Sequence, residues 1–267
     1  MITNKLSIDL LSFAAIGKPA GDLEARMVAF LERERSTESL DGAAFDQING
    51  SGAKADYLLG SRGIVAELKT LNASPLDRTE QRLKTRLAQP DAPIVFGTVG
   101  VSKIIEGLPD RDAIAKMMID MAGRAVRRHL QKANDQIGAI KERIGLNNAG
   151  GLLILMNDTE PMIDASAIAY TLKNAFENAA DPYPHITNVW ASIESHKIIM
   201  PDKRTGYPQL HVFKAPKSQG ELDYLGRMLG AWGHYNGSRT ERLRHRGDWD
   251  AMRPIYDGPA PTLQPFA

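Results

Sequence analysis

The alternation of apolar and polar residues predicts helices and strands that follow one another along the chain. Four apolar residues recur at helical spacing behind Asp22, a capping residue, so we expect a first helix over residues 23–34. A longer apolar stripe keeps the 3.6-residue period from residue 114 to residue 144 and predicts a long helix, which Gly123 is placed to split. Further helices are expected over residues 77–89, 165–176 and 221–229.

Short apolar runs mark the expected strands. Residues 152–156 are continuously apolar, which is typical of a strand buried on both faces, and we expect this strand in the interior of the sheet. Weaker strand signals stand at residues 93–99, 186–193 and 210–213. The order of elements predicts an α/β fold with a mixed central sheet flanked by helices.

The last quarter of the chain differs in composition from the rest. Prolines, glycines and tyrosines become more frequent after Met200. We therefore divide the chain into a core domain, residues 1–200, and a C-terminal extension of unknown role, residues 201–267.

The clearest local signal is a β-hairpin over residues 56–69, next to which we expect the strand at 152–156. Two apolar runs flank the turn sequence Gly60-Ser61-Arg62-Gly63. An even turn pairs residues whose numbers sum to 123, so Asp56 falls opposite Glu67. Because side chains alternate along a strand, Asp56, Glu67 and Lys69 share one face of the hairpin, while its other face forms an apolar core layer.

Composition narrows the chemistry that is open to the chain. It has no cysteine, which excludes disulfides, thiolate metal sites and cysteine nucleophiles and fits a reducing compartment, so we expect a soluble, cytoplasmic protein. We find no signal-peptide pattern in residues 1–20, and no apolar run approaches the roughly 18 residues that span a bilayer. The formal net charge of +1 shows no basic excess, so contact with nucleic acid must come from local patches.

Two carboxylates on one face of the hairpin favour a metal ion. Carboxylates about 5 Å apart repel one another unless a cation lies between them or one of them is protonated. Mg²⁺ is commonly held by one or two carboxylates together with waters and substrate phosphate, a pattern that Asp56 and Glu67 match. The alternative to a metal site is a surface ion pair between Glu67 and Lys69 with no catalytic role.

One string of residues covers the hairpin and its approach: Gly50-Ser51-Gly52, then Asp56, then ten residues, then Glu67-Leu68-Lys69. It resembles the PD-(D/E)XK nuclease superfamily, which includes restriction endonucleases and archaeal Holliday-junction resolvases, with Ala55 in place of the motif's proline. The resemblance implies a restriction-endonuclease-like core of helix, three-stranded meander, helix and further strand. It also implies that Asp56 and Glu67 bind Mg²⁺, with Mn²⁺ as an alternative, and that Lys69 lies beside the attacking water.

The resemblance points to residues outside the hairpin as well. Its resolvase-like branch carries an acidic residue on the first helix, for which we choose Glu24, with Glu32 and Glu34 as alternatives. Many members place a polar residue on the helix after the motif, and we assign Gln136 to that role, with Lys132 as the alternative.

Three residues are candidates for contact with nucleic acid. Ser51 lies in a Gly-Ser stretch whose amides can approach a phosphate, although a plain connection explains it equally. Arg128 and Lys132 belong to a basic run on the predicted long helix, for which a solvated face is the alternative. The six histidines show no pair at the spacing of a helical zinc site, and we assign none to a metal.

Two hypotheses for function follow. The first is an Mg²⁺-dependent nuclease that hydrolyses phosphodiester bonds in nucleic acid, with DNA as the expected substrate, through Asp56, Glu67 and Lys69. The second is a non-catalytic nucleic-acid-binding or assembly protein on the same core. Neither involves a membrane, and a homodimer is compatible with both.

Overall fold

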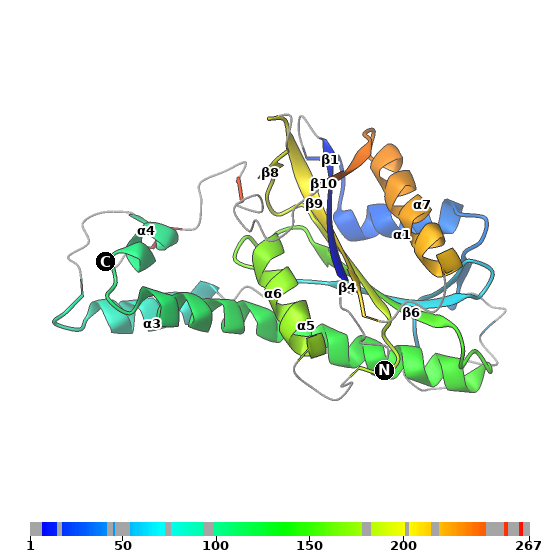
Figure 1. Ribbon diagram of the computed structural model, residues 1–267, viewed down its shortest axis with the longest axis horizontal. Helices are drawn as coiled ribbons and strands as arrows, with labels where there is room; N and C mark the ends of the chain where they lie inside the picture. The colour runs from blue at the N-terminus through cyan, green and yellow to red at the C-terminus, as the bar shows by residue number, and fades with distance from the viewer. Residues whose placement is uncertain are drawn as a thin grey trace.

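The chain folds around one mixed β-sheet of nine strands with helices on both faces (Figure 1), which confirms the expected α/β class. The computed structural model describes residues 7–14, 18–41, 45, 54–72, 76–92, 99–177, 183–200, 203–214, 219–243, 254–255 and 262–263. The helices are α1 (Leu23–Arg33), α3 (Leu76–Leu87), α4 (Val101–Glu106), α5 (Arg111–Arg143), α6 (Ala165–Glu177) and α7 (Gln219–Tyr235).

The sheet draws its strands from the whole length of the chain. Its members are β1 (Ser7–Ala14), β2 (Glu38–Ser39), β3 (Tyr57–Leu59), β4 (Ile64–Thr70), β6 (Gly150–Asn157), β7 (Asn188–Ile193), β8 (Ile198–Ile199), β9 (Thr205–Phe213) and β10 (Thr240–Leu243). Their order is β10-β1-β9-β7-β6-β4-β3-β2, with β8 paired to β9. A separate two-stranded sheet pairs β5 (Val99–Gly100) with β11 (Thr262–Leu263).

The hairpin has the predicted register. Tyr57 pairs with Ala66 and Leu59 with Ile64, so paired numbers sum to 123. The neighbour of β4 on its other side is β6, which runs parallel to it and parallel to β7 beyond. All eight residues of β6 are buried, which confirms the interior strand expected at residues 152–156.

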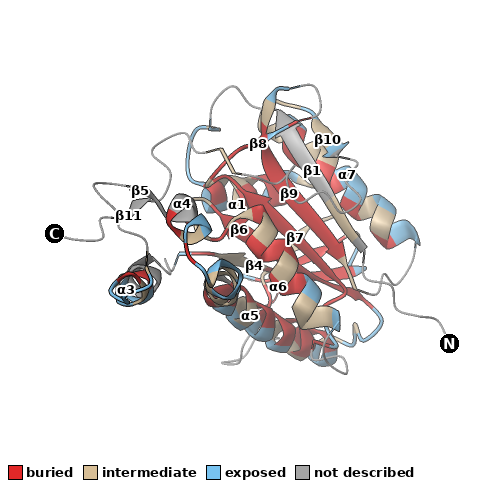
Figure 2. Cartoon of the chain, turned by 60° about the vertical axis from the view of Figure 1, so that its left-hand side comes forward, coloured by how far each residue is buried: buried red, intermediate tan, exposed pale blue. Residues whose placement is uncertain are grey.

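Apolar side chains cover both faces of the sheet, and Figure 2 shows that most of its strands are buried. On one face α1 and α7 form a cluster with Ile64 and Ala66. On the other face α5 and α6 form a cluster with Val65. The sequence predicted that only one face of the hairpin would belong to the core. This prediction is wrong, because Val65 lies in the core on the same face as Glu67. Helix α5 covers this face of β4, so the face is buried.

Helix α5 is one continuous helix of 33 residues, so Gly123 does not split it. A Cβ at Gly123 would lie 2.4 Å from Oγ1 of Thr171 on α6. The glycine therefore marks a close approach of two helices. The prediction for α1 is confirmed to within one residue, and the Asp22 side chain caps it by accepting a hydrogen bond of 2.8 Å from the amide of Ala25.

The region after residue 200 contributes to the same core as the region before it. Strand β9 pairs with β1 and β7 inside the sheet, and α7 packs on the sheet through Leu225 and Trp232. The division at residue 200 therefore falls within one packed unit, because β9 connects the N-terminal strand β1 to the rest of the sheet. Of the strand expected over residues 93–99, only the last residue lies within the described part of the chain, in β5.

Three helical segments form an arm beside the sheet: α3, α4 and the N-terminal half of α5 (Figure 1). The arm has a small apolar cluster of its own, made of Leu83, Leu87, Ile104 and Leu108. It connects the C-terminal end of β4 to the part of α5 that crosses the sheet. In the described part of the chain, no helix combines the length and the apolar character that crossing a bilayer requires.

Candidate functional site

Asp56 lies one residue before β3 and is fixed by two hydrogen bonds to β4. Its backbone N–H donates to the carbonyl of Ala66 over 3.1 Å, and its carboxylate accepts from the amide of Leu68 over 2.7 Å. The regular ladder ends at the Tyr57–Ala66 pair, so Asp56 reaches β4 through these two bonds and not through a further ladder pair. The hairpin thus holds the Asp56 carboxylate alongside β4, next to Glu67.

Glu67 is a buried carboxylate in the middle of β4. The residue is 1 % exposed, and one of its oxygens contacts the Lys69 ammonium. Its other oxygen, Oε2, is buried and accepts no hydrogen bond from the described residues, and the group close enough to share a proton with the Glu67 carboxyl is the Asp56 carboxyl. Burying a charged or polar group without a partner is costly, and such groups are concentrated at functional sites.

The two carboxyls perturb one another. Burial and, to a smaller extent, the negative charge of Asp56 raise the pKa of Glu67 to about 8, against the opposing effect of Lys69. Burial also raises the pKa of Asp56, although the Leu68 amide and the Lys69 charge act in the opposite direction. Lys69 alone does not compensate for the two carboxylates, so the site favours an additional positive charge.

Two other carboxyl groups with a buried, unpartnered oxygen can be compared with Glu67. Oε2 of Glu160 and Oε1 of Glu194 are also buried without a partner. Glu194, however, forms an ion pair with Arg26, and the Glu160 amide and carbonyl are bound by the Asn157 side chain. A second carboxyl, Asp158, also acts on Glu194, but there the two cations Arg26 and Lys18 oppose it, whereas at Glu67 the opposing cation is Lys69.

The donor set suits a hard divalent cation. Two carboxylates, with further positions left to water and phosphate, match the way Mg²⁺ binds in phosphoryl-transfer sites. Within the described residues no group of three or more His, Asp or Glu side chains converges to hold a metal. Asp56 and Glu67 would offer such an ion two carboxylate groups.

Helix α5 supplies the side wall of the site. The Gln136 side chain donates over 2.7 Å to the carbonyl of Lys54 and so ties α5 to the segment that leads into Asp56. Gln136, a candidate from the sequence, therefore lies beside the segment that carries the Asp56 carboxylate. Lys132 and Arg128, one and two turns earlier on the same helix, are exposed.

His129 was missed by sequence reasoning. Burial, together with the charges of Arg128, Lys69 and Lys132, lowers its pKa to about 4. These effects show that α5 places His129 close to Lys69, and its buried Nδ1 has no partner among the described residues. His129 lies seven residues, or two helical turns, before Gln136, and this spacing is the feature of the sequence that could have identified it.

Glu24 lies on the other side of the sheet. It accepts a hydrogen bond of 2.6 Å from the hydroxyl of Thr70. Because side chains alternate along β4, Thr70 points to the face opposite Glu67 and Lys69. The structure thus does not bring Glu24 together with the two carboxylates, and Ser51, the candidate in the Gly-Ser stretch, lies outside the described residues.

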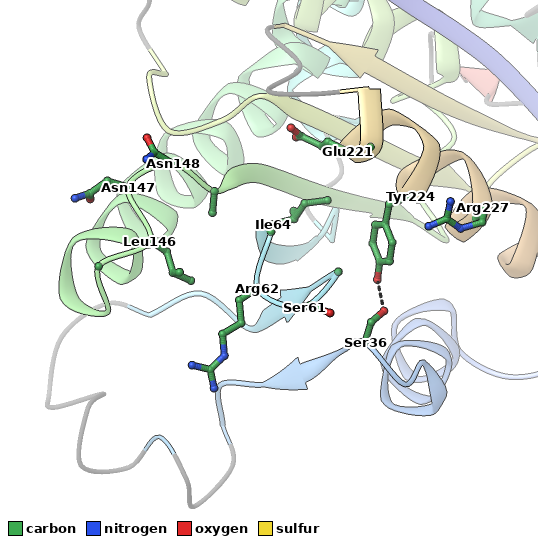
Figure 3. A pocket seen from close by; sticks show the side chains of 15 residues that line it. Ser36, Ser61, Arg62, Ile64, Leu146, Asn147, Asn148, Glu221, Tyr224 and Arg227 are labelled. Carbon is green, nitrogen blue, oxygen red and sulfur yellow. Dashed lines mark hydrogen bonds between the residues drawn. The ribbon is translucent and has the colours of Figure 1, made fainter.

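A separate pocket of about 940 Å³ opens at the turn of the hairpin, away from the carboxylates (Figure 3). It lies between the turn at Arg62, the loop at Asn147 and Asn148, and the first turns of α7, where the Tyr224 hydroxyl is hydrogen-bonded to Ser36 over 3.2 Å. The pocket contains none of the residues that sequence analysis selected.

The functional interpretation of this site rests on the geometry of its own residues. No protein-family model matches the chain, and no curated protein or solved structure matches it either.

Proposed function

We propose that this protein is a metal-dependent nuclease that hydrolyses phosphodiester bonds in nucleic acid, with DNA as its substrate. The observation that carries the proposal is Glu67: a buried carboxylate with one oxygen on Lys69, the other without a partner, and Asp56 beside it. An isolated arrangement of this kind costs stability, and a bound cation would compensate for it.

Each residue has a distinct role in the proposed reaction. Asp56 and Glu67 hold the ion, which supplies the positive charge that phosphoryl transfer requires. Lys69 is placed to orient the attacking water and to stabilise charge on the phosphate. Gln136 positions the segment before Asp56 through the Lys54 carbonyl.

The order of elements around the site supports the proposal. Helix α1 is followed by the antiparallel strands β2, β3 and β4, then by α5, and then by β6, which is parallel to β4. This is the order that the resemblance to PD-(D/E)XK nucleases implies for their core. The arm and the strands β7, β9, β1 and β10 are additions to that order.

The alternative function, binding of nucleic acid without cleavage, has one observation in its favour. The contact between Lys69 and Glu67 neutralises one carboxylate inside the protein. If that ion pair were the whole purpose of the site, the Asp56 carboxylate would serve only to accept the Leu68 amide, although its charge raises the pKa of Glu67.

A cleavage assay tests the proposal. The purified protein is incubated with linear, supercoiled and branched DNA, with single-stranded DNA and with RNA, each in Mg²⁺, in Mn²⁺ and in EDTA. We expect cleavage of DNA in Mg²⁺ or Mn²⁺ and none in EDTA, and we expect Asp56→Asn to abolish it. Cleavage that persists in EDTA would show that the reaction does not need a metal ion. Binding without cleavage of any substrate would favour the alternative function.

A further inference from the structure

A row of basic side chains runs along the middle of α5. Arg124, Arg128 and Lys132 follow one another at i, i+4 and i+8, which places them on one side of the helix over about 12 Å. All three side chains are exposed. The buried stripe of the helix, which includes Val126 and Leu130, faces the sheet and leaves this row on the outside.

The three cations of this row are not neutralised by the protein. None of them forms an ion pair or a hydrogen bond with the described residues, although other exposed cations of the chain do, such as Arg62 with Glu38. The two acids nearest to the row on α5 are engaged elsewhere. Asp120 pairs with Lys116, and Asp135 accepts a hydrogen bond from Gln131.

The row reaches the candidate site at its C-terminal end. The charges of Arg128, Lys69 and Lys132 all act on His129, so they surround that side chain. One turn beyond Lys132, Gln136 is bonded to the segment that precedes Asp56. The C-terminal end of the row therefore lies near Lys69 and the segment that leads into Asp56.

We infer that Arg124, Arg128 and Lys132 form a phosphate-binding track that holds the backbone of a nucleic acid beside Lys69 without reading its sequence. The inference rests on the proposed function, for which it names the mode of substrate recognition. Phosphate contacts position a nucleic acid, whereas contacts to base edges specify its sequence.

The amide side chains beside the track are hydrogen-bonded within the protein, so we expect them to add no readout of adenine. Asn and Gln are the residues that read adenine through paired hydrogen bonds. On this side of α5 the Gln131 amide donates to Asp135 and the Gln136 amide donates to the Lys54 carbonyl. Both amides are occupied within the protein, which leaves three long cationic side chains to meet the substrate.

The track also gives the substrate a direction. Lys132 is the end of the row next to Gln136, which is bonded to the segment before Asp56, and Arg124 is the end that lies in the N-terminal half of α5, within the arm. The nucleic acid therefore passes from the site toward the arm.

Binding measured in EDTA, where the proposed reaction does not proceed, tests the inference. Fluorescence anisotropy of labelled DNA is followed as a function of salt for the wild type, for Arg124→Gln, Arg128→Gln and Lys132→Gln, and for the triple variant. Two unrelated DNA sequences are used as probes. Arg111→Gln, on the same helix but about 20 Å from Arg124, and Arg239→Gln, after α7, are the matched controls.

Each substitution in the track should reduce the slope of log affinity against log salt by about 1, and the triple variant should reduce it by about 3. The loss should be equal on both sequences, and the controls should keep the wild-type slope. A triple variant with the wild-type slope, a loss that depends on the sequence, or a wild type that does not bind DNA would overturn the inference. A wild type that binds through the track but cleaves nothing would leave the track standing while the proposed function fails.

Discussion

Glu67 is the residue on which most of the account depends, and its burial links stability to pH. In the unfolded chain it has an ordinary pKa near 4.5, whereas in the folded protein burial and Asp56 raise that pKa to about 8. Between these values the unfolded chain releases a proton that the folded protein keeps. The stabilising effect of protonated Glu67 is therefore complete below about pH 4.5 and is lost as the pH rises toward 8.

Replacing Glu67 with Gln should remove this pH dependence. Each unit of pKa difference corresponds to about 1.4 kcal/mol, so the free energy of unfolding of the wild type should fall by several kcal/mol relative to Glu67→Gln between pH 5 and pH 8. Urea unfolding of both proteins at the two pH values measures the difference. Parallel pH profiles would show that Glu67 ionises freely in the folded protein.

Lys69 should affect the chemical step more than the binding of the ion. Because it contacts Glu67 but is itself not a ligand, Lys69→Met should slow cleavage by roughly 10²–10⁴-fold, the range for a group that assists proton transfer. Titration with Mn²⁺ should still detect a bound ion. Lys116→Met, which removes an exposed lysine paired with Asp120, is the control. Equal rates for the two variants would contradict the role given to Lys69.

For single residues, the sequence predicted those positions that depend only on the local geometry of the chain. The proximity of Asp56 and Glu67 follows from the turn and the alternation of β4, which involve only neighbouring residues. The nearness of His129 to Lys69 depends on how α5 crosses β4, which no local pattern encodes. Glu24 was placed with the carboxylates because α1 faces the sheet, but α1 packs on the face opposite Glu67.

At the scale of elements, the contact between α5 and α6 should tolerate no side chain at Gly123. A Cβ there would lie 2.4 Å from Oγ1 and 3.0 Å from Cγ2 of Thr171, a β-branched side chain with few alternative positions. Gly123→Ala should therefore destabilise the protein by about 1–3 kcal/mol, the usual cost of overpacking. Gly226→Ala in α7, where no atom lies within 4 Å, should instead stabilise it by about 0.5–1 kcal/mol.

Thermal denaturation measures both effects, and a double substitution identifies their cause. Gly123→Ala combined with Thr171→Ala removes the two contacting atoms and should recover part of the loss. A Gly123→Ala protein as stable as Gly226→Ala would mean that the helices do not approach one another at this point.

Elements with a strong periodic signal were predicted with nearly correct bounds, as α1 and α6 show. The pattern did not reveal that α5 is continuous, because a glycine that permits close packing and a glycine that breaks a helix look the same in sequence. Strand β1 was missed for a related reason: its apolar residues form a broken run, and its place in the sheet is fixed by β9, which lies nearly 200 residues later in the chain.

At the scale of the whole molecule, residues 201–267 should be required for folding. Strand β9 lies between β1 and β7, so its removal leaves β1 without its neighbour and exposes the edge of β7. A chain of residues 1–200 should lose the cooperative thermal transition of the full chain, as followed by circular dichroism. A cooperative transition in the shortened chain would restore the division at residue 200.

Composition reports on the character of loops and not on which strands pair, so it gave no sign that β9, after residue 200, lies between β1 and β7. Prolines and glycines after Met200 mark turns, but β9 between them is an ordinary buried strand whose partners come from both halves of the chain. The core order from α1 to β6 was predictable because its elements are consecutive in sequence.

The rate of DNA cleavage in Mg²⁺, compared between Glu67→Gln and Glu160→Gln, tests the central claim most directly. Both substitutions replace a buried carboxylate that has one oxygen without a partner, but only Glu67 lies beside Asp56 and Lys69. Glu67→Gln should cleave at least roughly a hundredfold more slowly than the wild type, because loss of the ion removes several kcal/mol of transition-state stabilisation. Glu160→Gln should cleave at the wild-type rate. Retention of the full rate by Glu67→Gln, or an equal loss in both variants, would contradict the assignment of Asp56, Glu67 and Lys69 as a metal-dependent active site.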